Sequence, residues 1–403
     1  MKIKSLRLFF IYFFLYIITP TLFLEIFAQF TLRNQLGENS YLFRTTKNNK
    51  SFMHIPSSKR DYKFKTLYDW ENNPNGTKVS FKTDIYGTIE PSSLEKVNKK
   101  NLDSILFCGG SSIENAYVKE GKRIPDIFSE ISKLESINAS KSGKDLKDCI
   151  LTIDYILKNT IKPPKFILIA TNVNTLGNFA LKRIQKLNDN YKTNDLQRIK
   201  KSFKKYFPGL YKSLSLIKRS NSYLSKILSP RYSKLSNQFN KYEVVDKEYL
   251  LGCCSISSKI NSNNNIGFNW EEAKNKTEYS LHLNKYIKAL DELIIRTNFN
   301  KNNVLIFIEP NSYHLKKIAS KYDFRKKQLL FDKNGNKYTL KETSFIYDIY
   351  DSIYGKQFLE NGFRVIEKPF ISDDDIFYDS VHFTKYGSFF IGNYILNNLN
   401  LLD

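Results

Sequence analysis

Short apolar runs alternate with longer stretches of helical periodicity along much of the chain. The apolar runs predict buried strands and lie at residues 104–107, 136–139, 166–170, 304–308 and 363–366. Apolar residues recur at helical spacing at 124–134, 146–157, 270–296 and 343–360, and in a closing segment from Phe389 to Ile395. This repeated alternation of strand and helix predicts an α/β sandwich with a mostly parallel sheet.

An apolar stretch near the N-terminus predicts a single transmembrane helix ahead of this fold. Residues 8–28 are nearly all apolar, and about 20 residues are enough for a helix to cross the hydrocarbon core. Lys2, Lys4 and Arg7 precede the stretch, so the positive-inside rule puts the N-terminus in the cytoplasm and the rest of the chain outside. A cleaved signal peptide is the alternative. The length of the run and the lack of a small-residue cleavage site favour an uncleaved anchor.

Changes in composition along the chain predict five parts. They are a cytoplasmic stub and anchor at 1–30, a membrane-proximal leader at 31–103, a first core segment at 104–178, a basic and mainly helical insert at 179–265, and a second core segment at 266–403. The insert is an interruption of the strand and helix alternation. Two interpretations of it remain open, a structural cap over the sheet or a surface that contacts an anionic membrane or an acidic glycan.

Composition and charge narrow the class of protein further. The chain of 403 residues is 41% hydrophobic and 15% aromatic, which excludes bulk disorder. Its formal net charge of +23 suggests an anionic partner, although a codon bias that enriches lysine throughout the chain would give the same charge. The sequence has no RNP, KH or zinc-finger pattern, and the predicted topology puts the basic insert outside the cytoplasm. We therefore expect no nucleic-acid partner.

The cysteines and histidines give no sign of a metal centre. The chain has four of each, with no C-x-x-C and no H-E-x-x-H pattern, so we expect neither a metal nor another cofactor. Cys108 and Cys149 lie in apolar patterns and are expected as small buried hydrophobic residues. Cys253 and Cys254 are adjacent in a predicted loop. The sequence assigns no disulfide.

Polar residues that suit acyl chemistry follow the predicted strands. Such chemistry needs a hydroxyl nucleophile, a base with an orienting carboxylate, and hydrogen-bond donors for the oxyanion. Ser111 follows a Gly-Gly turn at a predicted helix start, and Asp379 lies three residues before His382, a spacing that lets its carboxylate reach the imidazole in a turn. Gly143 offers an unhindered backbone N–H and Asn174 a side-chain amide. Because parallel strands end at one edge of the sheet, these residues form a candidate active site.

Four segments carry a resemblance to a known family: FCGGSSIE, INASKSG, ATNVNT and FYDSVHFTKYG. In this order and spacing they resemble the four blocks of the SGNH (GDSL-like) hydrolases, above all the bacterial members with a membrane anchor. The resemblance covers residues 104–178 and 266–403. It implies a three-layer α/β/α sandwich with a parallel sheet of about five strands.

The resemblance also implies a role for each candidate residue. Ser111 corresponds to the nucleophile, His382 to the base and Asp379 to its orienting carboxylate. The oxyanion donors are the N–H groups of Ser111 and Gly143 and the side chain of Asn174.

The sequence departs from the family pattern at two of these blocks. The Gly-Asp-Ser of the family is Gly109-Gly110-Ser111 here, and Ser112 is a second candidate nucleophile. In the third block, Asn172 stands where the family usually has glycine, so Asn172 is the alternative oxyanion donor to Asn174.

Together these features predict an extracytoplasmic, membrane-anchored serine esterase or O-acyltransferase. The expected substrate is an acyl ester, such as an acetyl ester, on an envelope glycan or exopolysaccharide. The motifs do not distinguish water from a sugar hydroxyl as the acceptor, because both routes share one acyl-enzyme. The alternative is a non-catalytic envelope protein that uses the same fold for assembly or glycan binding.

Overall fold

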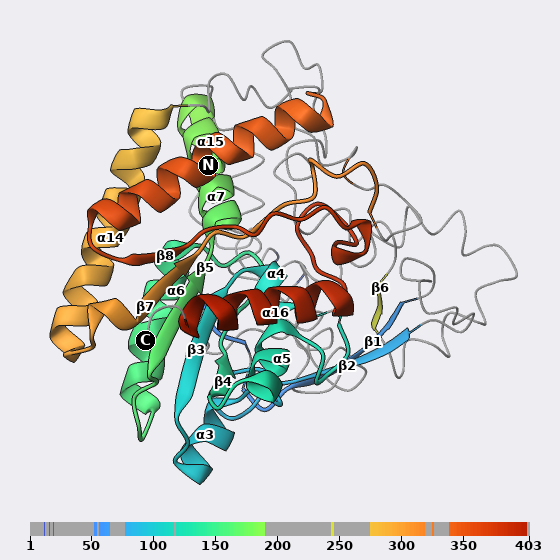
Figure 1. The fold of residues 1–403 in the computed structure, drawn as a ribbon, viewed down its shortest axis with the longest axis vertical. Coiled ribbons are helices and arrows are strands. Elements are labelled where there is room, and N and C mark those ends of the chain that lie inside the picture. Colours follow the sequence, from blue (N-terminus) through green and yellow to red (C-terminus); the bar gives the residue numbers. More distant parts are fainter. Residues whose placement is uncertain are drawn as a thin grey trace, which may run out of the picture. The chain divides into compact units, whose positions relative to one another are not determined.

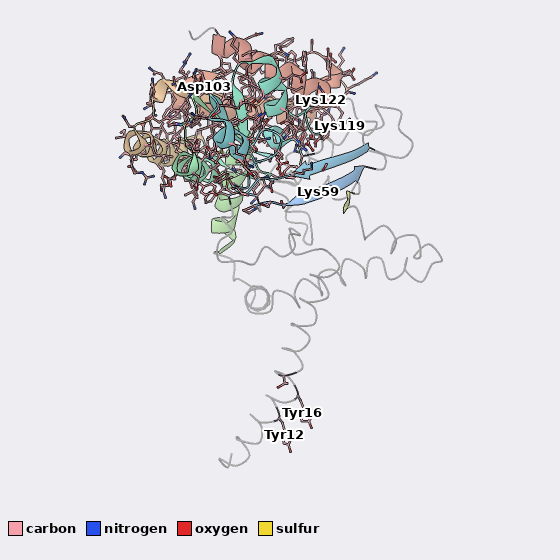
Figure 2. All side chains as sticks on the ribbon, turned by 90° about the horizontal axis from the view of Figure 1, so that it is seen from below. Tyr12, Tyr16, Lys59, Asp103, Lys119 and Lys122 are labelled. Carbon is pink, nitrogen blue, oxygen red and sulfur yellow. A yellow bond between two sulfur atoms is a disulfide. The ribbon has the colours of Figure 1, made fainter. Side chains whose placement is uncertain are left out.

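The computed structural model describes the α/β core and a few residues outside it. The described residues are Tyr12, Tyr16, Thr19, 52–54, 56–64, 77–116, 118–189, 243–245, 275–318, Arg325 and 338–400. The chain divides into two compact units, one made of residues 1–45 and 187–242 and the other of 46–186 and 243–403. In the first unit, the side chains of Tyr12 and Tyr16 are exposed, and their ring centroids lie 5.9 Å apart (Figure 2). Nearly all of the other described residues belong to the second unit.

Several sequence predictions concern residues outside these ranges. Nearly all of the predicted anchor at 8–28, most of the basic insert, and the Cys253–Cys254 pair lie there. Among the residues that are described, no helix has both the length and the apolar character needed to cross a membrane.

The centre of the second unit is a parallel sheet. In the part of the chain that the structure describes, it has five strands, which are β3 (Ser104–Gly109), β4 (Glu135–Asn138), β5 (Phe166–Ala170), β7 (Val304–Phe307) and β8 (Arg364–Ile366). Their order is β4-β3-β5-β7-β8, and every neighbouring pair is parallel. All five strands coincide with the predicted apolar runs to within two residues, and the sheet that was expected to be mostly parallel is parallel throughout.

Helices cover both faces of the sheet (Figure 1). One face carries α6 (Leu146–Asn159), α14 (Lys276–Thr297) and α15 (Leu340–Glu360), and the other carries α5 (Ile124–Ile131) and α16 (Lys385–Asn400). Successive residues of a strand point to opposite faces. Accordingly, Leu106 and Cys108 of β3 pack in the first layer, and Ile105 and Phe107 pack in the second. The three-layer α/β/α arrangement therefore follows from strands that are apolar on both sides.

The segment before β3 also packs against this core. It contains a hairpin of β1 (Lys59–Phe64) and β2 (Thr77–Lys82), which extends through β1 to β6 (Glu243–Val245), and a helix α3 (Leu94–Lys100). Met53, Leu94 and Val97 are buried in the same cluster as the sheet. The described part of the expected membrane-proximal leader thus contributes directly to the core.

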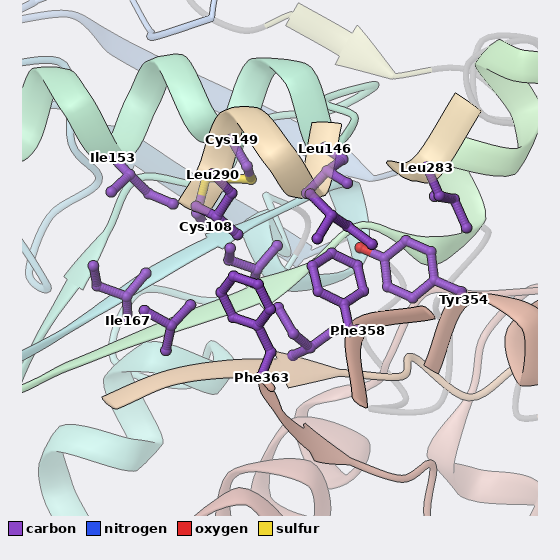
Figure 3. Packing of buried hydrophobic residues seen from close by; sticks show 14 of the residues in the cluster. Cys108, Leu146, Cys149, Ile153, Ile167, Leu283, Leu290, Tyr354, Phe358 and Phe363 are labelled. Atoms are coloured by element: carbon purple, nitrogen blue, oxygen red, sulfur yellow. A yellow bond between two sulfur atoms is a disulfide. The ribbon is translucent and has the colours of Figure 1, made fainter. Parts of the chain in front are cut away.

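A disulfide links strand β3 to the helix that covers it. Cys108 of β3 and Cys149 of α6 are fully buried, as expected, and their sulfur atoms are bonded to each other, which the sequence did not assign. Figure 3 shows the bond beside Leu290 of α14, inside the first helical layer. The two residues are 41 positions apart, a separation that neither strand nor helix periodicity reveals.

Removing this bond is expected to lower the free energy of unfolding by about 3 kcal/mol, because the bond limits the freedom of the unfolded chain. Chemical denaturation of Cys149→Ala, with and without reductant, measures the effect. A variant in which Cys253 and Cys254 are both Ser serves as the control, and reductant should still destabilise it. Equal stability of the wild-type protein with and without reductant would contradict the assignment of the bond.

Candidate active site

Ser111 and Asn174 lie where the direction of sheet assembly reverses. After β3 the chain adds β4 on one side of it and then β5 on the other. In open α/β sheets, ligands bind outside the carboxyl ends of the strands at such a reversal. Ser111 lies two residues after the end of β3, following Gly110, and Asn174 lies four residues after β5. Two of the predicted site residues therefore flank the reversal point.

The turn that carries Ser111 is closely packed. Gly110 donates its backbone N–H to the carbonyl of Ala170 at the end of β5 (3.2 Å). A Cβ atom on Gly110 would lie 2.0 Å from Nδ2 of Asn174, so only glycine lets that amide come so near the serine. The helix that begins at Ser111, α4 (Ser111–Glu114), is a single turn, and its dipole is therefore of little weight.

His382 and Asp379 form the pair that the sequence predicted. Nδ1 of His382 lies 2.7 Å from Oδ2 of Asp379. The other carboxylate oxygen, Oδ1, accepts the backbone N–H groups of Val381 (2.9 Å) and His382 (2.8 Å). The ring of Tyr378 is stacked on the imidazole, with centroids 5.5 Å apart. A carboxylate at Nδ1 places the proton there, which leaves Nε2 as the basic nitrogen.

Hydrogen bonds connect this pair to the other strands. Ser312, in the loop after β7, donates its backbone N–H to the carbonyl of Ser380 (2.9 Å) and its hydroxyl to the carbonyl of Asp379 (2.7 Å). Asn115, the C-cap residue of α4, donates a hydrogen bond from its side-chain amide to Oγ of Ser388 in α16 (2.7 Å). The serine turn and the histidine loop are thus held to a common framework.

The two predicted oxyanion donors occupy different settings. Gly143 lies in an exposed turn after β4 with a φ of +77°, a conformation that favours glycine. Asn174 lies in the first turn of α7 (Asn172–Asp189), a helix that begins seven residues before the helical insert expected from residue 179, and its amide lies against Gly110. The contact with Gly110 is what favours Asn174 as a donor near Ser111.

The two alternatives left open by the sequence have other partners. The amide of Asn172 donates to Oδ1 of Asp351 (2.8 Å) and to the carbonyl of Glu309 (3.3 Å), and its oxygen accepts the backbone N–H of Glu309 (3.0 Å). Asn172 therefore joins the ends of β5 and β7. The hydroxyl of Ser112 donates to Oε1 of Glu309. These contacts favour Asn174 over Asn172 as the donor and Ser111 over Ser112 as the nucleophile.

Glu309 is a site residue to which the sequence assigned no role. It follows β7 and is buried, and burial raises the pKa of its carboxyl group to about 8. The hydrogen bond from Ser112 acts in the opposite direction, as does the charge of His382, whereas the charge of Asp351 adds to the rise. The sequence pattern that could have identified Glu309 is a glutamate directly after a wholly apolar run.

The protonation of Glu309 predicts a pH dependence of stability. Between its ordinary pKa of 4.5 and its folded pKa of about 8, the folded protein binds a proton that the unfolded chain releases. The free energy of unfolding should therefore fall with rising pH in this window, by up to about 1.4 kcal/mol per pH unit. Glu309→Gln keeps an acceptor for Ser112 and removes the titration. Denaturation at pH 5 to 8 should show a shallower decline for the variant than for the wild type, and parallel curves would contradict the prediction.

A second polar cluster, also not anticipated, adjoins Gly143. His54, for which the sequence shows no partner, is buried, and its Nε2 lies 3.0 Å from the carbonyl of Ser140 and 3.2 Å from Oε1 of Glu114. Lys144, next to Gly143, is also buried, and burial lowers the pKa of its amine to about 7. Across the described segments, no group of three or more His, Cys, Asp or Glu residues is arranged to hold a metal ion.

Comparisons with known proteins do not assign a family. No family model and no curated protein matches the chain. Among solved structures, the chain is similar to LAE5, described as an alpha/beta hydrolase enzyme from the metagenome of Lake Arreo, Spain. The identity is 11%, the TM-score is 0.32, and the match covers 75% of this chain and 96% of LAE5. So low a TM-score does not establish a shared fold, and the interpretation of the site rests on its own geometry.

Proposed function

We propose that this protein is an extracytoplasmic, membrane-anchored serine esterase or O-acyltransferase of the SGNH (GDSL-like) type. The substrate is an acyl ester, such as an acetyl ester, on an envelope glycan or exopolysaccharide. The observation that supports the proposal is the His382–Asp379 pair, whose loop is hydrogen-bonded to the loop after β7 by Ser312, while Asn115 bonds the end of the serine helix α4 to Ser388 of α16. A serine nucleophile requires such a base, oriented by a carboxylate, within hydrogen-bond reach of its hydroxyl.

In the proposed reaction, Nε2 of His382 takes the proton of the Ser111 hydroxyl as Oγ attacks the acyl carbonyl. The N–H groups of Ser111 and Gly143 and the amide of Asn174 stabilise the oxyanion. His382 then gives its proton to the departing sugar oxygen, and Ser111 keeps the acyl group. Water or a second hydroxyl, deprotonated by His382, attacks this acyl-enzyme, and His382 returns the proton to Oγ of Ser111 as the bond between Oγ and the acyl carbon breaks. Asp379 holds the imidazole in the tautomer and orientation that both proton transfers need.

Two features support a location outside the cytoplasm. The apolar residues 8–28 follow three basic residues, the pattern of an anchor with a cytoplasmic N-terminus. The Cys108–Cys149 disulfide suits an oxidising compartment. A reporter enzyme that is active only outside the cytoplasm, fused to the C-terminus, is expected to be active.

The basic insert is then proposed to face the membrane or an acidic glycan. Neutralising its lysines should weaken salt-sensitive binding of the protein to anionic vesicles.

The activity is tested by assaying the full-length protein and Ser111→Ala with p-nitrophenyl acetate and with an acetylated oligosaccharide. Release of acetate by the wild-type protein alone supports an esterase. Transfer of the acetyl group to an added oligosaccharide, at the expense of free acetate, identifies a transferase. Folded wild-type protein that binds the oligosaccharide without cleaving either ester would favour the non-catalytic alternative.

A further inference from the structure

Glu114 connects the helix of the proposed nucleophile to the turn of a proposed oxyanion donor. It is the last residue of α4, one turn after Ser111, and it is buried. Its Oε2 accepts a hydrogen bond from the hydroxyl of Ser142, the residue directly before Gly143. The carboxylate therefore joins the element that starts at Ser111 to the turn that presents the Gly143 N–H.

His54 fixes the other side of the same carboxylate. Its Nε2 faces two oxygen acceptors, Oε1 of Glu114 at 3.2 Å and the carbonyl of Ser140 at 3.0 Å. A ring nitrogen that faces two acceptors carries the proton and donates. The ring also packs edge-on against Phe81, with centroids 5.0 Å apart, and its backbone lies close beneath Gly87. The orientation of Glu114 is thus set by residues that precede the first strand of the sheet.

The turn itself has further attachments on its other sides. The backbone N–H of Lys141 donates to the carbonyl of Gly109 (3.0 Å), and its amine donates to the carbonyl of Met53 (2.7 Å). The buried amine of Lys144 donates to the carbonyl of Ala139 and to Oγ1 of Thr152 (2.7 Å). These bonds hold the two ends of the turn. The middle, at the exposed Ser142 and Gly143, is held by Glu114.

We propose that Glu114 is a positioning residue, held by His54, that sets the place of the Gly143 N–H relative to Ser111 through its hydrogen bond with Ser142. The inference rests on the proposed function, in which Gly143 stabilises the oxyanion. Such a donor acts mainly in the transition state, and a displacement of about 1 Å can cost about 100-fold in rate. Loss of the bond should therefore lower kcat and leave KM almost unchanged.

The test uses full-length protein and p-nitrophenyl acetate. Glu114→Ala and Ser142→Ala should each lower kcat about 10- to 100-fold, with KM within about twofold of the wild type. The double variant should be no slower than the slower single variant, because both changes break one bond. Glu114→Gln, which keeps an oxygen for Ser142 but turns its amide NH2 toward the N–H of His54, should restore part of the activity. Glu130→Ala, on the exposed face of α5, is the matched control and should behave as the wild type.

A second measurement separates this inference from the proposed function. Hydrogen exchange of the backbone at 139–144 should be faster in Glu114→Ala than in wild-type protein or Glu114→Gln. Wild-type kcat in Ser142→Ala, additive losses in the double variant, or unchanged exchange in Glu114→Ala would each overturn the role of Glu114. Ester hydrolysis by Ser111→Ala equal to that of the wild type, together with faster exchange in Glu114→Ala, would overturn the proposed function and leave the positioning of the turn intact.

Discussion

Replacing Ser111 by alanine is expected to lower kcat for ester hydrolysis by about 10⁴-fold or more, without unfolding the protein. The reason is that Ser111 supplies the atom to which the acyl group is transferred, so no neighbouring side chain can replace it. His382→Ala and Asp379→Ala should also cause large losses, since the base and its orientation are both needed. Steady-state kinetics with p-nitrophenyl acetate measure each effect.

These three residues should behave as one unit. The variant that lacks both Ser111 and His382 should be hardly slower than Ser111→Ala alone, because a base without a nucleophile has nothing to activate. Ser112→Ala is the matched control, and it should keep most of the activity, since its hydroxyl is bonded to Glu309. The opposite pattern, with an active Ser111→Ala and an inactive Ser112→Ala, would transfer the role to Ser112.

The second large effect is expected at the contact between Gly110 and Asn174. Asn174→Ala removes an oxyanion donor and should lower kcat about 10²- to 10³-fold. Gly110→Ala should lower kcat about 10²-fold although it removes no polar group, because the new Cβ would lie 2.0 Å from the amide nitrogen and must displace it. Gly355→Ala is the matched control, since its nearest neighbour would be 3.6 Å away, and it should have little effect.

The two substitutions at this contact also predict a specific interaction. The variant with Gly110→Ala and Asn174→Ala should be no slower than Asn174→Ala alone, because the shortened side chain no longer meets the new methyl group. Additive losses, or wild-type kcat in Gly110→Ala, would contradict the assignment of Asn174 as a donor. Thermal unfolding of each variant shows whether a loss of activity is a loss of fold.

The strands of the core were predictable from the sequence because they are buried on both faces. Residues 104–107 and 166–170 are apolar at every position or nearly so, and only a sheet covered by helices on both sides accounts for that. The first turn of helix α7 was not predicted, because it is rich in asparagine and threonine, which favour caps and loops over helix interiors. From Leu176 onward apolar residues recur at helical spacing, and Leu176, Phe179 and Ala180 are buried in the core, so the helix runs across the boundary expected between residues 178 and 179.

The candidate site was predictable where its partners are close in sequence. Asp379 and His382 are three residues apart, and a turn brings them together, so the spacing alone revealed the pair. Glu309 bonds a serine 197 positions away, and His54 reaches a carbonyl 86 positions away. No local pattern encodes such distances. The choice between Asn172 and Asn174 was undetermined for the same reason, since it depends on Asp351 and Gly110.

The central claim is that Ser111 is a nucleophile activated by His382, and covalent labelling tests it most directly. A fluorophosphonate should form one adduct per molecule of full-length protein, and mass spectrometry of the peptides should locate it on Ser111. The adduct should be absent in Ser111→Ala and should form far more slowly in His382→Ala. An adduct on another residue, or labelling of folded Ser111→Ala at the wild-type rate, would contradict the claim.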